Sequence, residues 1–411
     1  MLSDAIAEAR RQAEICNACR YCEGYCAVFP AMFAKRAFAD ADLVQLANLC
    51  HNCRGCFYAC QYTAPHVFAL NLPAALAEAQ HESWKEFAWP KPFAQLFDRA
   101  GVAIAALLVC AFALLLWAAA ALRPAGGAGF YAVLSHGFMV AVFTPAFVLP
   151  LLAIGVSLRR YWRFVSGDGG DAVRLSDLRQ AIQDAASMRN LRGGHGDGCN
   201  FEDADKFSHA RRVLHQFTVA GFMLCFGATC AGTVMHYALD LPAPYGLFSA
   251  PKLLGVPGGI LLCIGSAGLA WLKTRADPAL GVRAAKIWRG EMAFIVLLFS
   301  AAATGLALYA ATVTTAIDTV TTTVGAGAID TVTAAAATVT AAGTVTTVGA
   351  GATSTGTVAT STAAAAAVTY LLPIHLATVL TLFLLTPYSK MAHGFYRITA
   401  LIKDKARTRC A

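Results

Sequence analysis

The sequence predicts an all-α membrane protein, in which a cysteine-rich helical N-terminal domain precedes a bundle of six transmembrane helices. The 411 residues are 57% hydrophobic and only 14% charged, which is far more apolar than a soluble globular protein of this size. The apolar residues fall into six runs of the length that a helix needs to cross a hydrocarbon core of ~30 Å. Eight of the 14 cysteines lie before residue 61.

The first element is a polar segment over residues 1–95, which a proline pair, Pro90 and Pro92, separates from the apolar part. Its N-terminus has neither the apolar core nor the small-residue cleavage site of a secretory signal. We therefore expect the segment to stay in the cytoplasm. Because that compartment is reducing, its cysteines are expected to bind metal and not to form disulfides.

Two cysteine runs in this segment share the spacing C-x2-C-x2-C-x3-C. The runs are Cys16, Cys19, Cys22, Cys26 and Cys50, Cys53, Cys56, Cys60. Three thiolates at such intervals can bind three corners of one [4Fe–4S] cubane, and in two-cluster ferredoxins the fourth cysteine binds the other cluster. This pattern predicts one cluster on Cys16, Cys19, Cys22 and Cys60, and a second on Cys50, Cys53, Cys56 and Cys26. We therefore expect a ferredoxin-like domain with two [4Fe–4S] clusters.

Zinc is the alternative metal, but zinc sites usually pair two C-x2-C knuckles, and a third cysteine at the same interval does not fit that pattern. The runs depart from the ferredoxin pattern in one respect, because Ala27 and Gln61 stand where a proline usually follows the fourth cysteine. No G-x-G-x-x-G motif follows a strand, so we expect the chain to bind no flavin or nicotinamide itself. Two clusters without a substrate site indicate an electron carrier.

The six apolar runs give the predicted transmembrane helices. They are Gly101–Leu122, Gly137–Leu158, Val213–Tyr237, Pro251–Leu272, Glu291–Ala311 and Val368–Thr386. The expected domains are thus the cluster domain (1–95), helices one and two (96–158), a cytoplasmic loop (159–212), helices three to five (213–311), a low-complexity segment (312–367), and helix six with a basic tail (368–411).

The orientation follows from the lysines and arginines, which gather in the 159–212 loop, after the fourth span and in the tail. The loop after the first span has only Arg123, and residues 312–367 have no Lys or Arg. The positive-inside rule therefore predicts that both termini are cytoplasmic in a bacterial inner membrane. Residues 312–367, rich in Ala, Thr, Val and Gly, are expected to form an extracytoplasmic insertion.

Four histidines stand at matched depths of two antiparallel spans. His215 and His236 are 21 residues apart, or ~31 Å along a helix, and His375 and His393 are 18 residues apart, or ~27 Å. His215 is therefore expected to face His393 on the cytoplasmic side, and His236 to face His375 on the outer side. Such pairs are what bis-histidine b-type haem requires.

Arg211 and Arg212, just before His215, are predicted to hold haem propionates. The alternative is that single histidines at helix ends only anchor the helices at the membrane interface. His209 is a rival to His215 as a ligand on the cytoplasmic side, and His136 is a rival ligand on the outer side. Cys225 and Cys230 are interpreted as packing residues. The loop sequence GGHGDGC offers one more pair of metal ligands.

With these features together, the chain resembles the tricarballylate/citrate-utilisation protein B family. The resemblance rests on both cysteine runs, on the segment RRVLHQFTVAGFMLCFGATCAGTVMHY and on the ending HLATVLTLFLLTPYSKMAH, and covers nearly the whole chain except residues 312–367. That ending also resembles the last helix of the nitrate reductase gamma subunit, a quinol-linked dihaem protein. This second resemblance implies that His375 and His393 are haem ligands.

The family resemblance implies electron transfer from an FAD-dependent dehydrogenase of tricarballylate or a related tricarboxylate, through the clusters and one or two b-type haems, to quinone. It implies no substrate-oxidising site in the chain itself. The alternative is an iron–sulfur and cytochrome b subunit of another quinone-linked complex, similar to heterodisulfide reductase or nitrate reductase. A transporter with a redox sensor is a third possibility, but it would need basic residues inside the bundle, and the spans contain essentially none.

Overall fold

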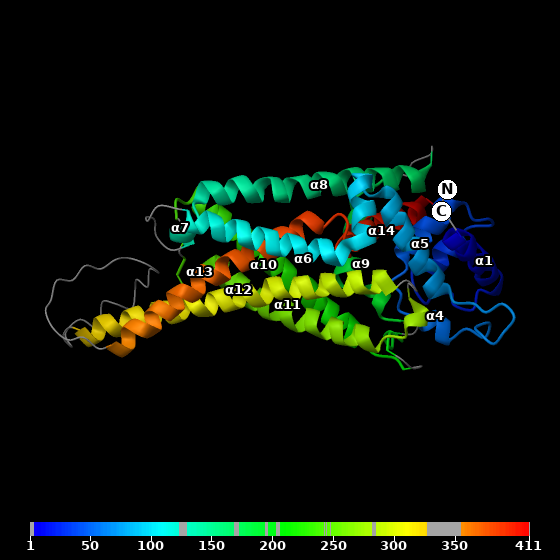
Figure 1. Ribbon diagram of the computed structural model, residues 1–411. Coiled ribbons are helices and arrows are strands. Elements are labelled where there is room, and N and C mark those ends of the chain that lie inside the picture. Colours follow the sequence, from blue (N-terminus) through cyan, green and yellow to red (C-terminus); the bar gives the residue numbers. More distant parts are fainter. Residues whose placement is uncertain are drawn as a thin grey trace.

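The computed structural model describes residues 4–122, 130–167, 172–193, 196–202, 206–241, 243, 245–246, 248–281, 285–326 and 355–410. Their regular structure is helical, apart from two isolated β-bridges, Cys199 with Ser208 and Glu202 with Ala276. The all-α prediction is confirmed. Figure 1 shows an elongated bundle with a small helical domain at one end, where both termini lie.

The N-terminal domain is made of five helices joined by short loops that carry the cysteines. They are α1 (Asp4–Cys19), α2 (Val28–Phe33), α3 (Asp40–Leu49), α4 (Gly55–Tyr58) and α5 (Leu72–Phe87). Helix α5 starts where the Asn71 side chain accepts a hydrogen bond from the Ala74 amide, with a proline in the first turn. Helix α1 ends within the first cysteine run, where Arg20 adopts a left-handed conformation.

The six predicted spans are all present as long apolar helices. The helices are α6 (Lys91–Ala121), α8 (His136–Ser166), α10 (Ala210–Ala238), α11 (Ala250–Arg275), α12 (Ala285–Ala326) and α13 (Thr355–Leu385). Pro145 and Pro150 lie inside α8 as expected. The chain is a multi-pass membrane protein.

Helices α12 and α13 extend into the low-complexity segment, so that residues 312–326 and 355–367 are helical. In Figure 1 these two extensions run side by side beyond the ends of the other helices. Residues 327–354 lie outside the described residues. The location of the segment outside the cytoplasm stays a prediction.

The remaining elements are α7 (Phe130–Val133), α9 (Leu175–Ala186), α14 (Ala392–Cys410) and two 3-10 turns, η1 (Arg189–Leu191) and η2 (Pro278–Leu280). Helices α8, α9 and α14 share one hydrophobic core with α1, α2, α3 and α5. At its centre, the fully buried Tyr161 of α8 donates a hydrogen bond to Gln45 of α3 at 2.7 Å. The Gln45 amide donates in turn to the Ala400 carbonyl of α14 at 2.8 Å. The cysteine-bearing domain is therefore packed onto one end of the bundle.

Helices α10 and α11 pack at very short range through glycines. A Cβ atom on Gly221 would lie 2.5 Å from the Leu262 amide nitrogen, and one on Gly265 would lie 2.6 Å from the Thr218 amide nitrogen. Only glycine permits this approach, as is common between transmembrane helices. Because His215 and His236 lie on α10, this contact helps to fix their positions.

Candidate functional site

The eight cysteines of the two runs line two cavities, and the fourth cysteine of each run lies with the other run. The first set is Cys16, Cys19, Cys22 and Cys60, around a cavity of about 240 Å³. The second set is Cys26, Cys50, Cys53 and Cys56, around a cavity of about 20 Å³. Each set thus combines three cysteines of one run with the fourth cysteine of the other, which is the exchange of fourth ligands that the spacing predicts.

The first set lies near the surface. Cys19 is exposed, and the other three thiols are half-buried. Burial raises the pKa of Cys16 to about 12, with further contributions from the thiols of Cys60, Cys22 and Cys19. Because metal binding requires the thiolate, an iron–sulfur cluster would have to supply the positive charge that deprotonates these groups.

The second set lies deeper in the protein. Cys53 is buried, and burial raises the pKa of Cys26 and Cys56 well above the usual thiol value. Burial also raises the pKa of Cys50, to about 11, while the charges of Arg397 and Arg211 act in the opposite direction. The second set therefore has positive charges close to it.

Three arginines, Arg54, Arg211 and Arg397, surround the second cysteine run and are called the arginine cluster below. Arg397 donates to the carbonyl of Cys50 at 2.6 Å, and Arg211 donates to the carbonyl of Asn52 at 2.6 Å. Arg54 is only 4% exposed and donates to the Asn52 side chain at 3.1 Å. No described carboxylate forms an ion pair with any of the three. Buried cations need counter-charge, and a thiolate-bound iron–sulfur cluster is an anion. The residues present thus fit an anionic cluster at the second set.

Within the described residues, no three His, Cys, Asp or Glu side chains are arranged to share one metal ion. This does not conflict with a cubane, because its four cysteines bind four different iron atoms and stand further apart than the ligands of a single ion.

The inner histidine pair, His215 and His393, is brought together as the sequence predicts. The two ring centres are 5.9 Å apart and the ring planes are nearly perpendicular, at 82°. Since an imidazole nitrogen binds a transition metal at about 2 Å, two imidazoles on opposite sides of one metal have ring centres about 6 Å apart. His393 donates a hydrogen bond from Nδ1 to the Lys390 carbonyl, which leaves Nε2 available. Its pKa is lowered well below the usual value by burial and by Arg397 and Lys390, and neutral imidazole is the form that binds metal.

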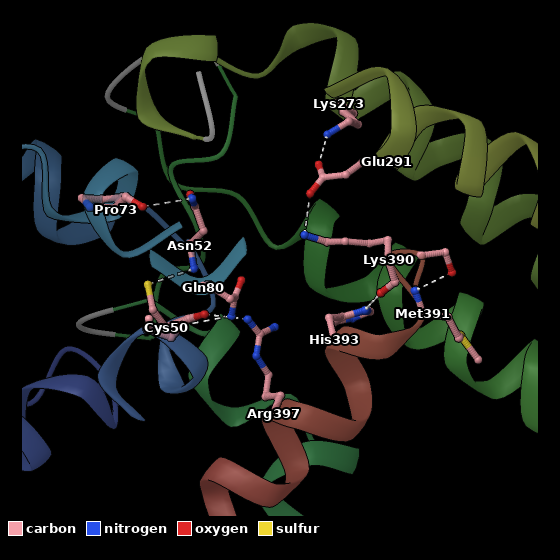
Figure 2. A network of polar contacts seen from close by, with 12 residues as sticks. Cys50, Asn52, Pro73, Gln80, Lys273, Glu291, Lys390, Met391, His393 and Arg397 are labelled. Atoms are coloured by element: carbon pink, nitrogen blue, oxygen red, sulfur yellow. Dashed lines mark hydrogen bonds and ion pairs between the residues drawn. The ribbon is translucent and has the colours of Figure 1, made fainter. Parts of the chain in front are cut away.

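The inner pair lies next to the second cysteine set. Arg397, one helical turn after His393 on α14, reaches the carbonyl of Cys50 (Figure 2). His51 follows Cys50 directly and is held by a contact of 2.8 Å between its Nδ1 and the Leu49 carbonyl. His51 also lines the cavity of the second set. Burial lowers its pKa, as do the charges of Arg397, Arg211 and His215.

A buried polar network adjoins the inner pair and was not foreseen from the sequence. Glu291, on α12, forms ion pairs with Lys273 of α11 and with Lys390, the latter at 2.6 Å (Figure 2). The side chains of Glu291 and Lys273 are 22% and 13% exposed. This network ties three parts of the chain together at the end of the bundle that faces the N-terminal domain.

The outer histidines take different partners from those predicted. His236 stacks on His136, the rival named above, with ring centres 4.3 Å apart, and His136 contacts the Tyr237 hydroxyl at 2.8 Å. His375 contacts the Thr304 hydroxyl at 3.2 Å through Nδ1. No contact between described side chains joins His236 to His375, so the outer pair stays a prediction.

Both arginines that were predicted to hold propionates have main-chain partners. Arg211 bonds to Asn52 as described above and lies over the Phe201 ring at 4.1 Å, and Arg212 donates to the Ser187 carbonyl at 2.9 Å.

The other candidate ligands lie apart from the histidine pairs. Cys199 is buried and packs beside Cys53, so its side chain helps to enclose the second set. His195 lies outside the described residues. Cys225 packs in the core between helices, and Cys230 is exposed on α10.

The fold and the two cysteine sets define a multi-pass membrane protein with a ferredoxin-like N-terminal domain. The profile of the Citrate utilization protein B Fer4-like domain matches residues 9–86, and the profile of Citrate utilization protein B matches residues 94–330 and 327–411. The chain is also 37% identical to Citrate utilization protein B of Escherichia coli over 409 residues, which cover 98% of this chain and 93% of that protein. The chain belongs to the Citrate utilization protein B family. No solved structure matches it.

Proposed function

We propose that this protein carries electrons from an FAD-dependent dehydrogenase of tricarballylate, or of a related tricarboxylate, through two [4Fe–4S] clusters and b-type haem to quinone. The observation that supports the proposal most is that the second cysteine set and the inner histidine pair lie together, joined by Arg397. A cluster ligand and two metal-binding imidazoles are thus neighbours at the end of the bundle where the N-terminal domain packs. This is an arrangement for passing electrons from a soluble domain into a membrane.

In this proposal, the first set binds one cluster and the second set the other, while His215 and His393 bind the haem iron. The clusters and the haem supply the redox chemistry when bound. The chain positions them, places the second set beside α10 and α14, and presents the first set, with its exposed Cys19, towards solvent, where a partner protein has access. The presence of the termini and the cysteine domain at one end of the bundle supports a cytoplasmic location for both, in agreement with the distribution of basic residues.

The experiment is anaerobic purification of the full chain, followed by EPR and optical spectroscopy of the same sample. We expect the EPR signals of two reduced clusters and the absorption band of a reduced b-type haem. Zinc in place of reducible iron would refute the cluster assignment. His393→Ala should remove the haem band and leave the cluster signals. His209→Ala is the matched control, because His209 is exposed and lies six residues before His215; it should keep both.

Transfer from the partner is tested by adding a purified tricarballylate dehydrogenase with its substrate. The cluster signals should then appear without any chemical reductant, and addition of a quinone should reoxidise them. If a different flavoprotein co-purifies and alone reduces the clusters, the substrate part of the proposal is wrong and the electron-carrier part stands.

A further inference from the structure

The two cysteine runs carry an arginine at the same position, between their second and third cysteines, but the two side chains differ in their exposure to solvent. These are Arg20 in the first run and Arg54 in the second, and both have positive φ angles, 57° and 67°. Arg20 is exposed to solvent, whereas Arg54 is 4% exposed. The same local sequence feature therefore places a screened charge at one site and a buried charge at the other.

Packing of the bundle adds two more charges to the second site only. Arg211 comes from the start of α10 and Arg397 from α14, and both guanidinium groups donate to carbonyls of the second run. The Nε atom of Arg397 is buried with no hydrogen-bond partner among the described atoms. Arginine stays protonated in proteins at neutral pH, so all three groups carry a positive charge.

Among the described residues, the first run has no comparable set of fixed charges. Its exposed Arg20 donates from Nε to the Asn17 carbonyl at 3.1 Å. In the second run, Arg211 and Arg397 reach main-chain carbonyls from distant segments, and the buried Arg54 donates to the Asn52 side chain. Three guanidinium groups are therefore fixed beside the second set.

We propose that the arginine cluster raises the reduction potential of the second cluster above that of the first, so that electrons run from the first set to the second and then to the inner histidine pair. This inference rests on the proposed function. The potential of an iron–sulfur cluster depends on its net charge, its hydrogen bonds and its exposure, and reduction adds one negative charge. Positive charges fixed in a region of low dielectric stabilise the reduced form more than they stabilise the oxidised form.

Solvent near the first set also stabilises a reduced cluster, but it screens charges that are exposed, such as that of Arg20. The three guanidinium groups at the second set are held by hydrogen bonds and are screened much less. The inference requires that their effect exceed that of the solvent, and the order of the two potentials tests this.

The positions of the two sites agree with this direction. Cys56 and Phe29 line both cavities, so the sites are adjacent. The first set includes the exposed Cys19 and is open to a redox partner, whereas the second set is bound to α14 through Arg397. In the transfer step, one electron leaves the reduced first cluster, which is oxidised, and enters the oxidised second cluster, which is reduced. No bond forms or breaks.

The test is a redox titration of the full-length protein monitored by EPR, with wild type and variants. Cys60→Ser identifies the signal of the first cluster, since Cys60 belongs to the first set. In the wild type we expect the other signal, that of the second cluster, to appear at the higher potential. The opposite order would overturn the inference even if both clusters are present, whereas absence of the clusters would overturn the proposed function itself.

The variants test the cause of the difference. Arg397→Gln should lower the potential of the second cluster by about 59 mV or more, which is a tenfold change in the equilibrium constant for transfer between the clusters. The potential of the first cluster should not change. Arg397→Lys keeps the charge and should restore most of the potential. Arg20→Gln, at the matching position of the first run, should change neither potential by as much. If Arg397→Gln loses the second cluster, Arg211→Gln is judged by the same criterion. Equal shifts of both clusters, or no shift, would contradict the inference.

Discussion

The glycine contact between α10 and α11 allows a sharp test of the packing that positions the histidines. Replacing Gly265 by alanine would put a Cβ atom 2.6 Å from the Thr218 amide nitrogen and 2.7 Å from the Leu214 carbonyl oxygen. An ordinary contact needs at least 3.4 Å, so the two helices would have to separate by about 0.8 Å. Both neighbours are main-chain atoms, so no rotation of a side chain can relieve the clash.

Overpacking of this kind costs about 1–3 kcal/mol. Gly155→Ala is the matched control, because Gly155 lies inside α8 and a Cβ there meets no atom within 4 Å. Alanine is favoured over glycine in a helix interior by up to about 1 kcal/mol, so the control should be neutral or stabilising. Since Leu214 directly precedes His215, the shift of α10 should also alter the inner histidine pair.

The assay is thermal unfolding of the detergent-solubilised protein, with the haem absorption band recorded in parallel. Gly265→Ala should unfold at a lower temperature than both wild type and Gly155→Ala, and it should change the haem spectrum. Equal unfolding temperatures for the two variants would show that the helices are not packed as closely as described, and that the reasoning is wrong.

The exchange of fourth ligands predicts that Cys60→Ser alters the same EPR signal as Cys16→Ser, and that Cys26→Ser alters the same signal as Cys50→Ser; the reverse pairing of signals would contradict it. Glu291→Gln leaves two largely buried lysine charges without their carboxylate and should cost roughly 3 kcal/mol, at the low end for breaking a buried ion pair because the site is partly exposed. Thermal unfolding measures this loss, and an unchanged unfolding temperature argues against a buried network. Hydrogen bonds from Arg409 lower the pKa of Asp177, so the stability from this contact is present above the usual carboxyl pKa and is lost as the pH falls through the lowered value. The protection of amides at the end of α14, measured relative to the intrinsic exchange rate at each pH, should therefore fall in acid, and Asp177→Asn should remove that pH dependence.

Much of the fold and part of the site could be predicted from residue spacing and hydropathy. The six spans follow from runs of apolar residues, because a helix must satisfy its own backbone in the membrane and needs a fixed length to cross it. The inner histidine pair was predicted from the depths of its residues, but the count along one helix was wrong for His393. This residue lies on α14, after the break that follows Leu385 at the end of α13, and not on the helix of His375. Depth alone could not decide the partner of His236, since both His375 and its rival His136 were expected on the outer side. The tertiary structure shows that His236 stacks on His136.

The sequence by itself predicted which cysteines stand together. Three ligands of each set follow from a local interval, and the fourth follows from the pattern of two-cluster ferredoxins. It could not determine that Arg20 is exposed and Arg54 buried, since the two runs match at that position. Only the packing of α10 and α14 against the N-terminal domain brings Arg211 and Arg397 to the second run. Burial and the sum of nearby charges depend on distant segments, and for that reason the difference between the two sites was decided by the tertiary structure.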